Sequence, residues 1–265
     1  MKTYALLDSG DLQKWERFGP FILQRPCPQA VWRPQGSIEA DAIFSREGEN
    51  KWTFRRKLPS SWTIELDGVV MKIALTDFGH VGVFPEHASL WGWMRSLLTK
   101  ESKVLNLFAY SGGATLAAAK AGASVCHLDA SKGMIQWARE NSVLNNLEGA
   151  PIRWIADDAS KFLKREIKRG VRYDGIILDP PTFGRGSKGE VFKIEKEIIP
   201  LLEMCRDLSP RFVLFSCHTP GFTPIVLSHL LTQIFSARIE TSEMLLSSEG
   251  ALSIPCGSVA HILYD

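Results

Sequence analysis

The stretch from residue 104 to residue 119 constrains the fold more than any other part of the chain. The run Val104–Phe108 is short, apolar and without alternation, which is typical of a parallel strand covered on both faces. Gly112 and Gly113 allow a sharp turn that brings backbone close to a ligand above the strand end. The small-residue helix that follows presents unpaired N–H groups at its start. The stretch therefore predicts either a ligand crevice of an open α/β sheet or an ordinary strand-to-helix turn.

The next strand favours the ligand crevice. A second apolar run, Ser124–Leu128, ends at Asp129, where a carboxylate can accept hydrogen bonds from ribose hydroxyls. The turn after the first strand lacks the third glycine of a dinucleotide fingerprint, so no pyrophosphate cradle is expected. These features predict a nucleoside ligand without phosphates, and S-adenosylmethionine is the common one.

Composition limits the remaining possibilities. The chain has 265 residues, of which 45% are hydrophobic, enough for one α/β domain with a small extra module. The net charge of +2 means that nucleic-acid affinity must come from local patches. The five cysteines form no C-x-x-C pair, so neither a metal site nor a disulfide framework is expected. No apolar stretch has the length of a signal peptide or membrane span, and we expect a cytoplasmic protein.

Residues 1–75 are expected to form a small β-rich module, and residues 76–265 the main domain. Prolines divide the module into short strands, and Asp67-Gly68 joins the alternating runs 62–66 and 69–73 in a predicted hairpin. The basic run Arg55-Arg56-Lys57 lies beside aromatic residues. Such a mixture can bind single-stranded nucleic acid, although it is more often a solvated edge.

From residue 103 onward the pattern is strand followed by helix. A third strand, 152–156, ends at Asp157-Asp158, of which one carboxylate can cap the next helix and the other can meet an adenine amine. A fourth, 173–178, leads into Asp179-Pro180-Pro181, a rigid extended turn. A mobile basic loop over 184–189 and a helix over 190–208 are expected next.

The end of the chain completes the predicted sheet. A fifth strand, 211–215, is followed by Ser216-Cys217-His218. Thr223-Pro224 is a good helix start, and strands near 239–246 and 258–264 end the chain as a reversed final hairpin would.

Taken in order, these motifs resemble class I S-adenosylmethionine-dependent methyltransferases, and more narrowly the RlmI-type family that forms 5-methylcytosine in ribosomal RNA. The resemblance implies an α/β, Rossmann-like sheet of seven mostly parallel strands with the last one reversed. It implies S-adenosylmethionine as cofactor and ribosomal RNA as partner. The implied cofactor-binding residues are Phe84, Glu86, Asn106, Phe108, Tyr110, Ser111, Gly112, Gly113, Asp129, Ala130, Ser131, Asp157, Asp158, Asp179 and Pro180. The chain departs from the family in having no room for its N-terminal RNA-binding module and in Ser-Cys-His, where Ser-Cys-Ser is usual.

The resemblance makes Cys217 and Asp179 the candidate catalytic residues. Carbon 5 of a pyrimidine is a poor nucleophile until a thiolate adds to carbon 6, and Cys217 alone among the cysteines follows a strand end. Asp179 would then orient the base. A buried, inert Cys217 is the alternative. Two other hypotheses stay open: methylation of an exocyclic amine held by Asp179-Pro180-Pro181, and a non-catalytic adaptor that binds RNA.

Overall fold

The computed structural model describes residues 4–46, 48–185, 191–248 and 250–264. The chain divides into two compact units, one formed by Met1–Ala88 with Leu245–Pro255 and the other by Ser89–Met244 with Cys256–Asp265. The expected boundary near residue 75 therefore falls inside the first unit. The sequence also gave no sign that residues 245–255 belong with the N-terminal part, a link to which the Ser248 hydroxyl contributes by donating to the carbonyl of Leu6 at 3.0 Å.

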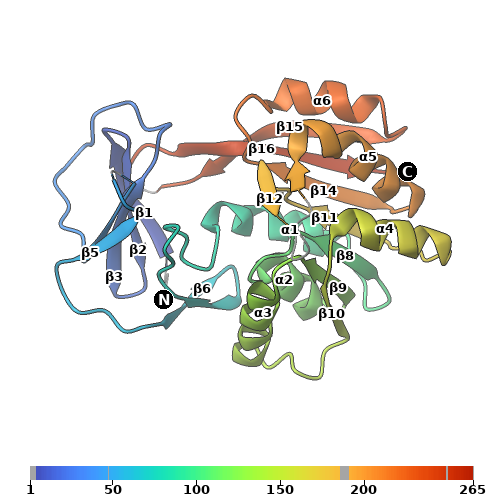
Figure 1. Cartoon of the computed structure of the whole chain (residues 1–265), viewed down its shortest axis with the longest axis horizontal. Coiled ribbons are helices and arrows are strands. Elements are labelled where there is room, and N and C mark those ends of the chain that lie inside the picture. Colours follow the sequence, from blue (N-terminus) through green and yellow to red (C-terminus); the bar gives the residue numbers. More distant parts are fainter. Residues whose placement is uncertain (1–3, 47, 186–190, 249, 265) are drawn as a thin grey trace. The chain divides into compact units, whose positions relative to one another are not determined.

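The first unit is β-rich, as expected. Its strands, drawn in blue to cyan in Figure 1, are β1 (Tyr4–Gly10), β2 (Gln13–Phe18), β3 (Phe21–Pro26), β4 (Ala42–Ser45), β5 (Lys51–Phe54), β6 (Trp62–Leu66) and β7 (Val69–Ile73). The first five form one sheet in chain order, and β6 pairs with β7 in a separate hairpin. The hairpin has the predicted bounds because Asp67 and Gly68 both adopt positive φ, 46° and 77°, as its two-residue turn requires.

The second unit contains a seven-stranded sheet. In spatial order its strands are β10 (Ile152–Ala156), β9 (Ser124–Asp129), β8 (Lys103–Leu107), β11 (Gly175–Leu178), β14 (Phe212–Cys217), β16 (Ile254–Leu263) and β15 (Arg238–Leu246). The first five are parallel to their neighbours, and β16 runs antiparallel to β14. The Rossmann-like fold with a reversed last strand is therefore confirmed. Because parallel strands end at one edge, the polar residues after β9, β8 and β11 gather there with the end of β14.

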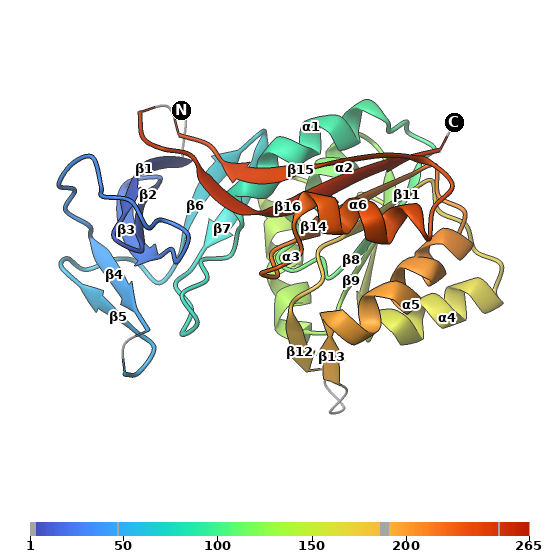
Figure 2. The same ribbon diagram turned by 90° about the horizontal axis from the view of Figure 1, so that it is seen from above.

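Helices cover the two faces of this sheet (Figures 1 and 2). These helices are α1 (Ala88–Ser96), α2 (Gly113–Lys120), α3 (Lys132–Leu144), α4 (Ala159–Lys168), α5 (Ile194–Asp207) and α6 (Pro224–Thr232). The short helix η1 (Pro85–His87) belongs to the first unit. A buried apolar cluster joins α4, α5 and α6 to one face of the sheet. Side chains expected to cap α3, α4 and α6 do so: Ser131, Asp158 and Thr223 each accept a backbone N–H of the first turn. No helix among the described residues is long and apolar enough to cross a membrane.

Two local predictions differ from the structure. Strand five extends to Cys217, because β16 continues to pair with β14 as far as Cys217 opposite Ser258. The helix expected from residue 190 begins at Ile194, because β12 (Phe183–Arg185) and β13 (Val191–Lys193) form a short hairpin first. Most of the expected basic loop, residues 186–190, lies outside the described part of the chain. Pro200 lies inside α5.

Candidate functional site

The loop between β8 and α2 has an unusual backbone. Phe108, Tyr110 and Gly112 all have positive φ, at 55°, 50° and 92°. Such conformations are unfavourable for residues other than glycine and persist only where the surroundings hold them. Here the amide of Ala109 donates to the carbonyl of Leu128 at 3.0 Å, and the amide of Gly112 donates to the carbonyl of Ala109 at 3.0 Å. The chain therefore holds a strained turn at the carboxyl end of the central strand.

The two glycines of this loop are required by packing as well as by the turn. A Cβ on Gly112 would lie 3.0 Å from the Cβ of Ala138 on α3, and the positive φ already disfavours a side chain. A Cβ on Gly113 would lie 2.7 Å from Cζ2 of Trp91 on α1. Since these neighbours are helix side chains, the loop is pressed against α1 and α3. The glycines therefore set the position of the start of α2.

Asp129 ties this loop to the end of β9. One oxygen, Oδ2, accepts the amide of Tyr110 at 2.9 Å, and the other, Oδ1, accepts the amide of Ser131 at 2.8 Å. Burial raises the pKa of this carboxyl, and the two backbone donors oppose the rise. Each carboxylate oxygen has about two lone pairs, so Asp129 can still accept a hydroxyl from a ligand. Ala130 and Ser131 beside it are exposed.

A buried polar chain supports the turn from below. Nδ2 of Asn106 on β8 donates to Oγ1 of Thr115 on α2 at 2.9 Å, and Oγ1 of Thr115 lies 2.8 Å from Nδ1 of His127 on β9. All three residues are buried. The amide of Asn106, a predicted cofactor residue, thus donates to Thr115 in the core beneath the loop. Burial lowers the pKa of His127 to about 3, with the backbone of Tyr110 opposing the shift. No sequence pattern indicated that Thr115 and His127 would support this loop.

Ser111 is held from the side by α3. Nδ2 of Asn141, which is fully buried, donates to the carbonyl of Ser111 at 2.9 Å. The ring of Tyr110 lies 6.5 Å from that of Trp137 on the same helix. The sequence analysis did not identify Asn141. An asparagine on the inward face of a predicted helix could have indicated it, because a buried amide needs a hydrogen-bond partner. Helix α3 therefore fixes both the backbone and one ring of the loop.

The two carboxylates after β10 have different partners. Oδ1 of Asp158 accepts the amide of Lys161 at 2.9 Å and caps α4. Asp157 accepts the amide of Asp158 at 2.8 Å and forms an ion pair with Arg165. Both carboxylates lie at the same sheet edge as Asp129, since β10 pairs with β9 up to Ala156 opposite Asp129. The cap is thus Asp158, and the expected contact of a carboxylate of this pair with an adenine amine stays a prediction.

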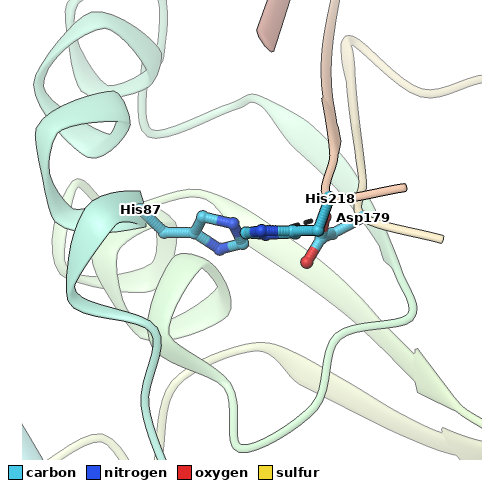
Figure 3. Close-up of side chains that lie close together, drawn as sticks. All are labelled: His87, Asp179 and His218. Atoms are coloured by element: carbon cyan, nitrogen blue, oxygen red, sulfur yellow. Dashed lines mark ion pairs between the residues drawn. The ribbon is translucent and has the colours of Figure 1, made fainter. Parts of the chain in front are cut away.

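Asp179 follows β11 and interacts with the end of β14. Its Oδ1 accepts the hydroxyl of Ser216 at 2.9 Å and lies 3.5 Å from Nε2 of His218. Figure 3 shows the imidazole of His218 beside the carboxylate of Asp179; it also draws His87, the last residue of η1, which belongs to the first unit. The two loops are joined once more by the hydroxyls of Thr182 and Thr219, 2.8 Å apart.

Cys217 lies on the other face of the sheet. Side chains alternate along a strand, and Cys217 shares the apolar cluster of α4, α5 and α6 with Phe215, whereas Ser216 reaches Asp179. The side chain of Cys217 is 0% exposed. Burial raises the pKa of its thiol, hydrogen bonds from Thr219 oppose the rise, and the charge of Asp179 adds to it. A thiol in these surroundings stays protonated near neutral pH.

Comparison with known proteins decides the family. The model of a family described as S-adenosylmethionine-dependent methyltransferases matches residues 44–229. The chain belongs to the S-adenosylmethionine-dependent methyltransferase family. It is therefore an enzyme that uses S-adenosylmethionine, and the hypothesis of a non-catalytic adaptor is not supported.

Individual relatives agree with this assignment. A crystal structure of an S-adenosylmethionine-dependent methyltransferase from Agrobacterium tumefaciens is 35% identical, with a TM-score of 0.95 over 100% of this chain and 91% of that one. Ribosomal RNA large subunit methyltransferases K/L from Colwellia psychrerythraea and Pseudoalteromonas translucida are 30% and 32% identical over 181 residues, 66% and 67% of this chain. The chain spans 24% and 25% of these two relatives, about a quarter of their length.

The residues of this methyltransferase fit its cofactor chemically. Asp129 retains acceptor capacity that suits ribose hydroxyls, and the start of α2 has backbone N–H groups that would suit a polar or anionic group of the ligand. Two other predicted cofactor residues, Phe84 and Glu86, lie in the first unit, where Phe84 packs its ring 5.5 Å from that of His80 and Glu86 is buried. Contact with the cofactor stays a prediction for all of the predicted residues.

The hairpin of β12 and β13 contacts the loop between β8 and α2. The ring of Phe192 on β13 lies 5.4 Å from that of Phe108. Figure 2 shows this hairpin projecting away from the sheet just before α5. Phe183, four residues after Asp179, is 50% exposed on the first strand of the hairpin. The sequence predicted a loop over 184–189 and a helix from residue 190, so the contact of this hairpin with Phe108 was not predicted.

Proposed function

We propose that this methyltransferase transfers a methyl group to an exocyclic amine of a base in ribosomal RNA. The RNA is supported by the relatives from Colwellia and Pseudoalteromonas, which are named as ribosomal RNA large subunit methyltransferases. The amine is supported by the Asp179-Pro180-Pro181 turn, which offers one carboxylate and rigid backbone at the end of β11. S-adenosylmethionine, when bound, supplies a methyl group carried on a sulfonium sulfur.

In this proposal the chain binds and orients the amine. Asp179 accepts one N–H of the amine, and the hydroxyl of Ser216, which donates to Oδ1, fixes the direction of its carboxylate. Pro180, which is buried, prevents the turn from continuing as a helix and keeps local carbonyls in place. In this proposal the half-exposed ring of Phe183 stacks on the base.

One observation carries the choice of an amine: Asp179, Ser216 and His218 interact on one face of the sheet, whereas Cys217 is buried in the core of the opposite face. Amine methylation requires only the first group. The alternative predicted from the family resemblance, methylation of cytosine at carbon 5, requires Cys217 to act as a thiolate on the base. Its burial and raised pKa would both have to be reversed when RNA binds.

Replacement of Cys217 separates these two mechanisms. We would compare wild type, Cys217→Ala and Cys205→Ala on transcribed large-subunit ribosomal RNA with tritiated S-adenosylmethionine. Cys205 is the matched control, because it is also 0% exposed and sits in α5, away from the strand ends. We expect both variants to retain turnover within about threefold, and we expect nucleoside mass spectrometry to find an N-methylated base.

The opposite result is equally clear. If Cys217→Ala abolishes transfer while Cys205→Ala does not, and calorimetry shows unchanged cofactor affinity, the thiol is the nucleophile. Wild type would then also form a covalent adduct with RNA that contains 5-fluorocytosine, which Cys217→Ala would not. That outcome would replace the amine by carbon 5 of cytosine.

A further inference from the structure

His218 follows the end of β14, and its two ring nitrogens have different neighbours. Nδ1 lies 2.8 Å from the carbonyl oxygen of Cys256 on β16, and Nε2 lies 3.5 Å from Oδ1 of Asp179. The residue follows β14 directly and is partly exposed, with 31% of its side chain accessible. Figure 3 shows the imidazole edge and the carboxylate facing each other. The backbone of β16 therefore holds Nδ1, and Nε2 faces the carboxylate of Asp179.

The contact with Cys256 determines the tautomer. A carbonyl oxygen only accepts hydrogen bonds, so Nδ1 must carry the proton that is donated to it. In the neutral ring Nε2 is then an acceptor with its lone pair turned to Asp179. A close approach of Gly257 holds this strand in place, since a Cβ there would lie 2.4 Å from the carbonyl of Cys217. The backbone, and not a side chain, thus sets the state of His218.

A proton that arrives at Nε2 is stabilised by this geometry. In the neutral ring two acceptor atoms face each other across 3.5 Å, and protonation converts that contact into an ion pair with Asp179. An amine nitrogen that gains a methyl group must lose a proton, because the product would otherwise be a cation. The arrangement therefore has an acceptor where the proposed reaction releases a proton.

We propose that His218 is the proton acceptor of methyl transfer, an inference that rests on the amine substrate proposed above. The amine nitrogen forms the new bond to the methyl carbon, and the electron pair of the broken carbon–sulfur bond stays on sulfur. The amine proton passes to Nε2 of His218, Asp179 stabilises the imidazolium, and the proton then leaves to solvent through the exposed edge of the ring. Thr219, whose hydroxyl contacts Thr182, keeps the following loop in place.

The test uses two substitutions that remove different functions of His218. In His218→Asn the amide nitrogen takes the position of Nδ1 and keeps the donation to Cys256, but the proton acceptor is lost. In His218→Ala both are lost. The exposed His229 on α6 gives the control His229→Asn. Turnover on transcribed large-subunit ribosomal RNA is measured together with cofactor affinity by calorimetry and with ¹⁵N-histidine spectra of the free protein.

We expect His218→Asn and His218→Ala to lose turnover equally, by about 100-fold or more, with cofactor affinity unchanged. The spectra should assign the Nδ1–H tautomer to neutral His218. If His218→Asn keeps wild-type turnover while His218→Ala loses it, His218 only braces β16 and the inference is wrong; an Nε2–H tautomer would also overturn it. Failure of the proposed function looks different, because the wild-type product would then not be an N-methylated base, whatever the variants do.

Discussion

His127 makes the folded protein sensitive to acid in a way that one substitution can isolate. The ring is fully buried, and its Nδ1 lies 2.8 Å from the hydroxyl of Thr115, which also accepts the amide of Asn106. A protonated ring would place a charge in the core, away from water. The pKa of His127 accordingly falls from 6.5 to about 3 in the folded state.

The sign and size of the effect follow from linkage. Below pH 6.5 the unfolded chain binds a proton at His127 that the folded chain does not, so the free energy of unfolding falls as pH decreases. The fall is about 1.4 kcal/mol per pH unit, or about 2.7 kcal/mol between pH 6.5 and pH 4.5. It ends near pH 3, where the folded state also takes up the proton.

The variant His127→Asn keeps a polar atom beside Thr115 but no longer titrates in this range. We expect it to be less stable than wild type at pH 7 by about 1–3 kcal/mol, because a buried ring is replaced by a smaller group. In urea unfolding at pH 7, 6, 5 and 4.5, the free energy of unfolding of wild type should fall by about 2.7 kcal/mol more than that of His127→Asn. The control His229→Asn should show no such trend relative to wild type. A difference that is constant from pH 7 to pH 4.5 would refute the argument.

Four further predictions concern the site and the fold. Asp129→Ala should weaken S-adenosylmethionine binding by about 10- to 100-fold in calorimetry, since a charge-assisted hydrogen bond contributes about 1.5–3 kcal/mol; an affinity equal to that of the exposed control Asp207→Ala would contradict the ribose assignment. Gly113→Ala should cost about 1–3 kcal/mol of stability by collision with Trp91, whereas Gly133→Ala, whose nearest neighbour is 3.7 Å away, should not destabilise α3. Asn141→Ala should raise the dissociation constant of the cofactor, because it releases the carbonyl of Ser111. An equal rise in the dissociation constant in Asn145→Ala, whose amide donates within α3, would indicate a general loss of stability instead. A fragment of residues 1–75 should not be stable alone, because 245–255 belong to the same unit; recovery of that soluble fragment after limited proteolysis would contradict this.

The elements that the sequence predicts well are those fixed by neighbouring residues. The hairpin of β6 and β7 depends on Asp67 and Gly68, which lie in the turn itself. The caps of α3 and α4 depend on one side chain and an amide three residues later. The apolar run before Gly112 identifies the central strand β8, because a strand covered on both faces is apolar along its whole length and can be recognised from its own residues.

The parts that the sequence misses depend on residues far apart in the chain. Cys217 was expected beyond a strand end, but pairing with Ser258 extends β14 over it, and no local pattern reports that pairing. The polar chain from Asn106 to His127 exists only once β8, α2 and β9 are packed. The sequence placed the ends of β10 and β11 correctly, but it did not reveal which face of the sheet each side chain occupies.

The central claim is that the chain methylates an exocyclic amine of ribosomal RNA. The most direct measurement is mass spectrometry of nucleosides from the large-subunit ribosomal RNA of a strain that lacks this gene, compared with its parent and with the strain complemented by wild type or by Asp179→Ala. The account predicts that one N-methylated base is missing in the deletion strain, returns with wild type and does not return with Asp179→Ala. An unchanged set of modified nucleosides, or loss of 5-methylcytosine instead, would contradict it.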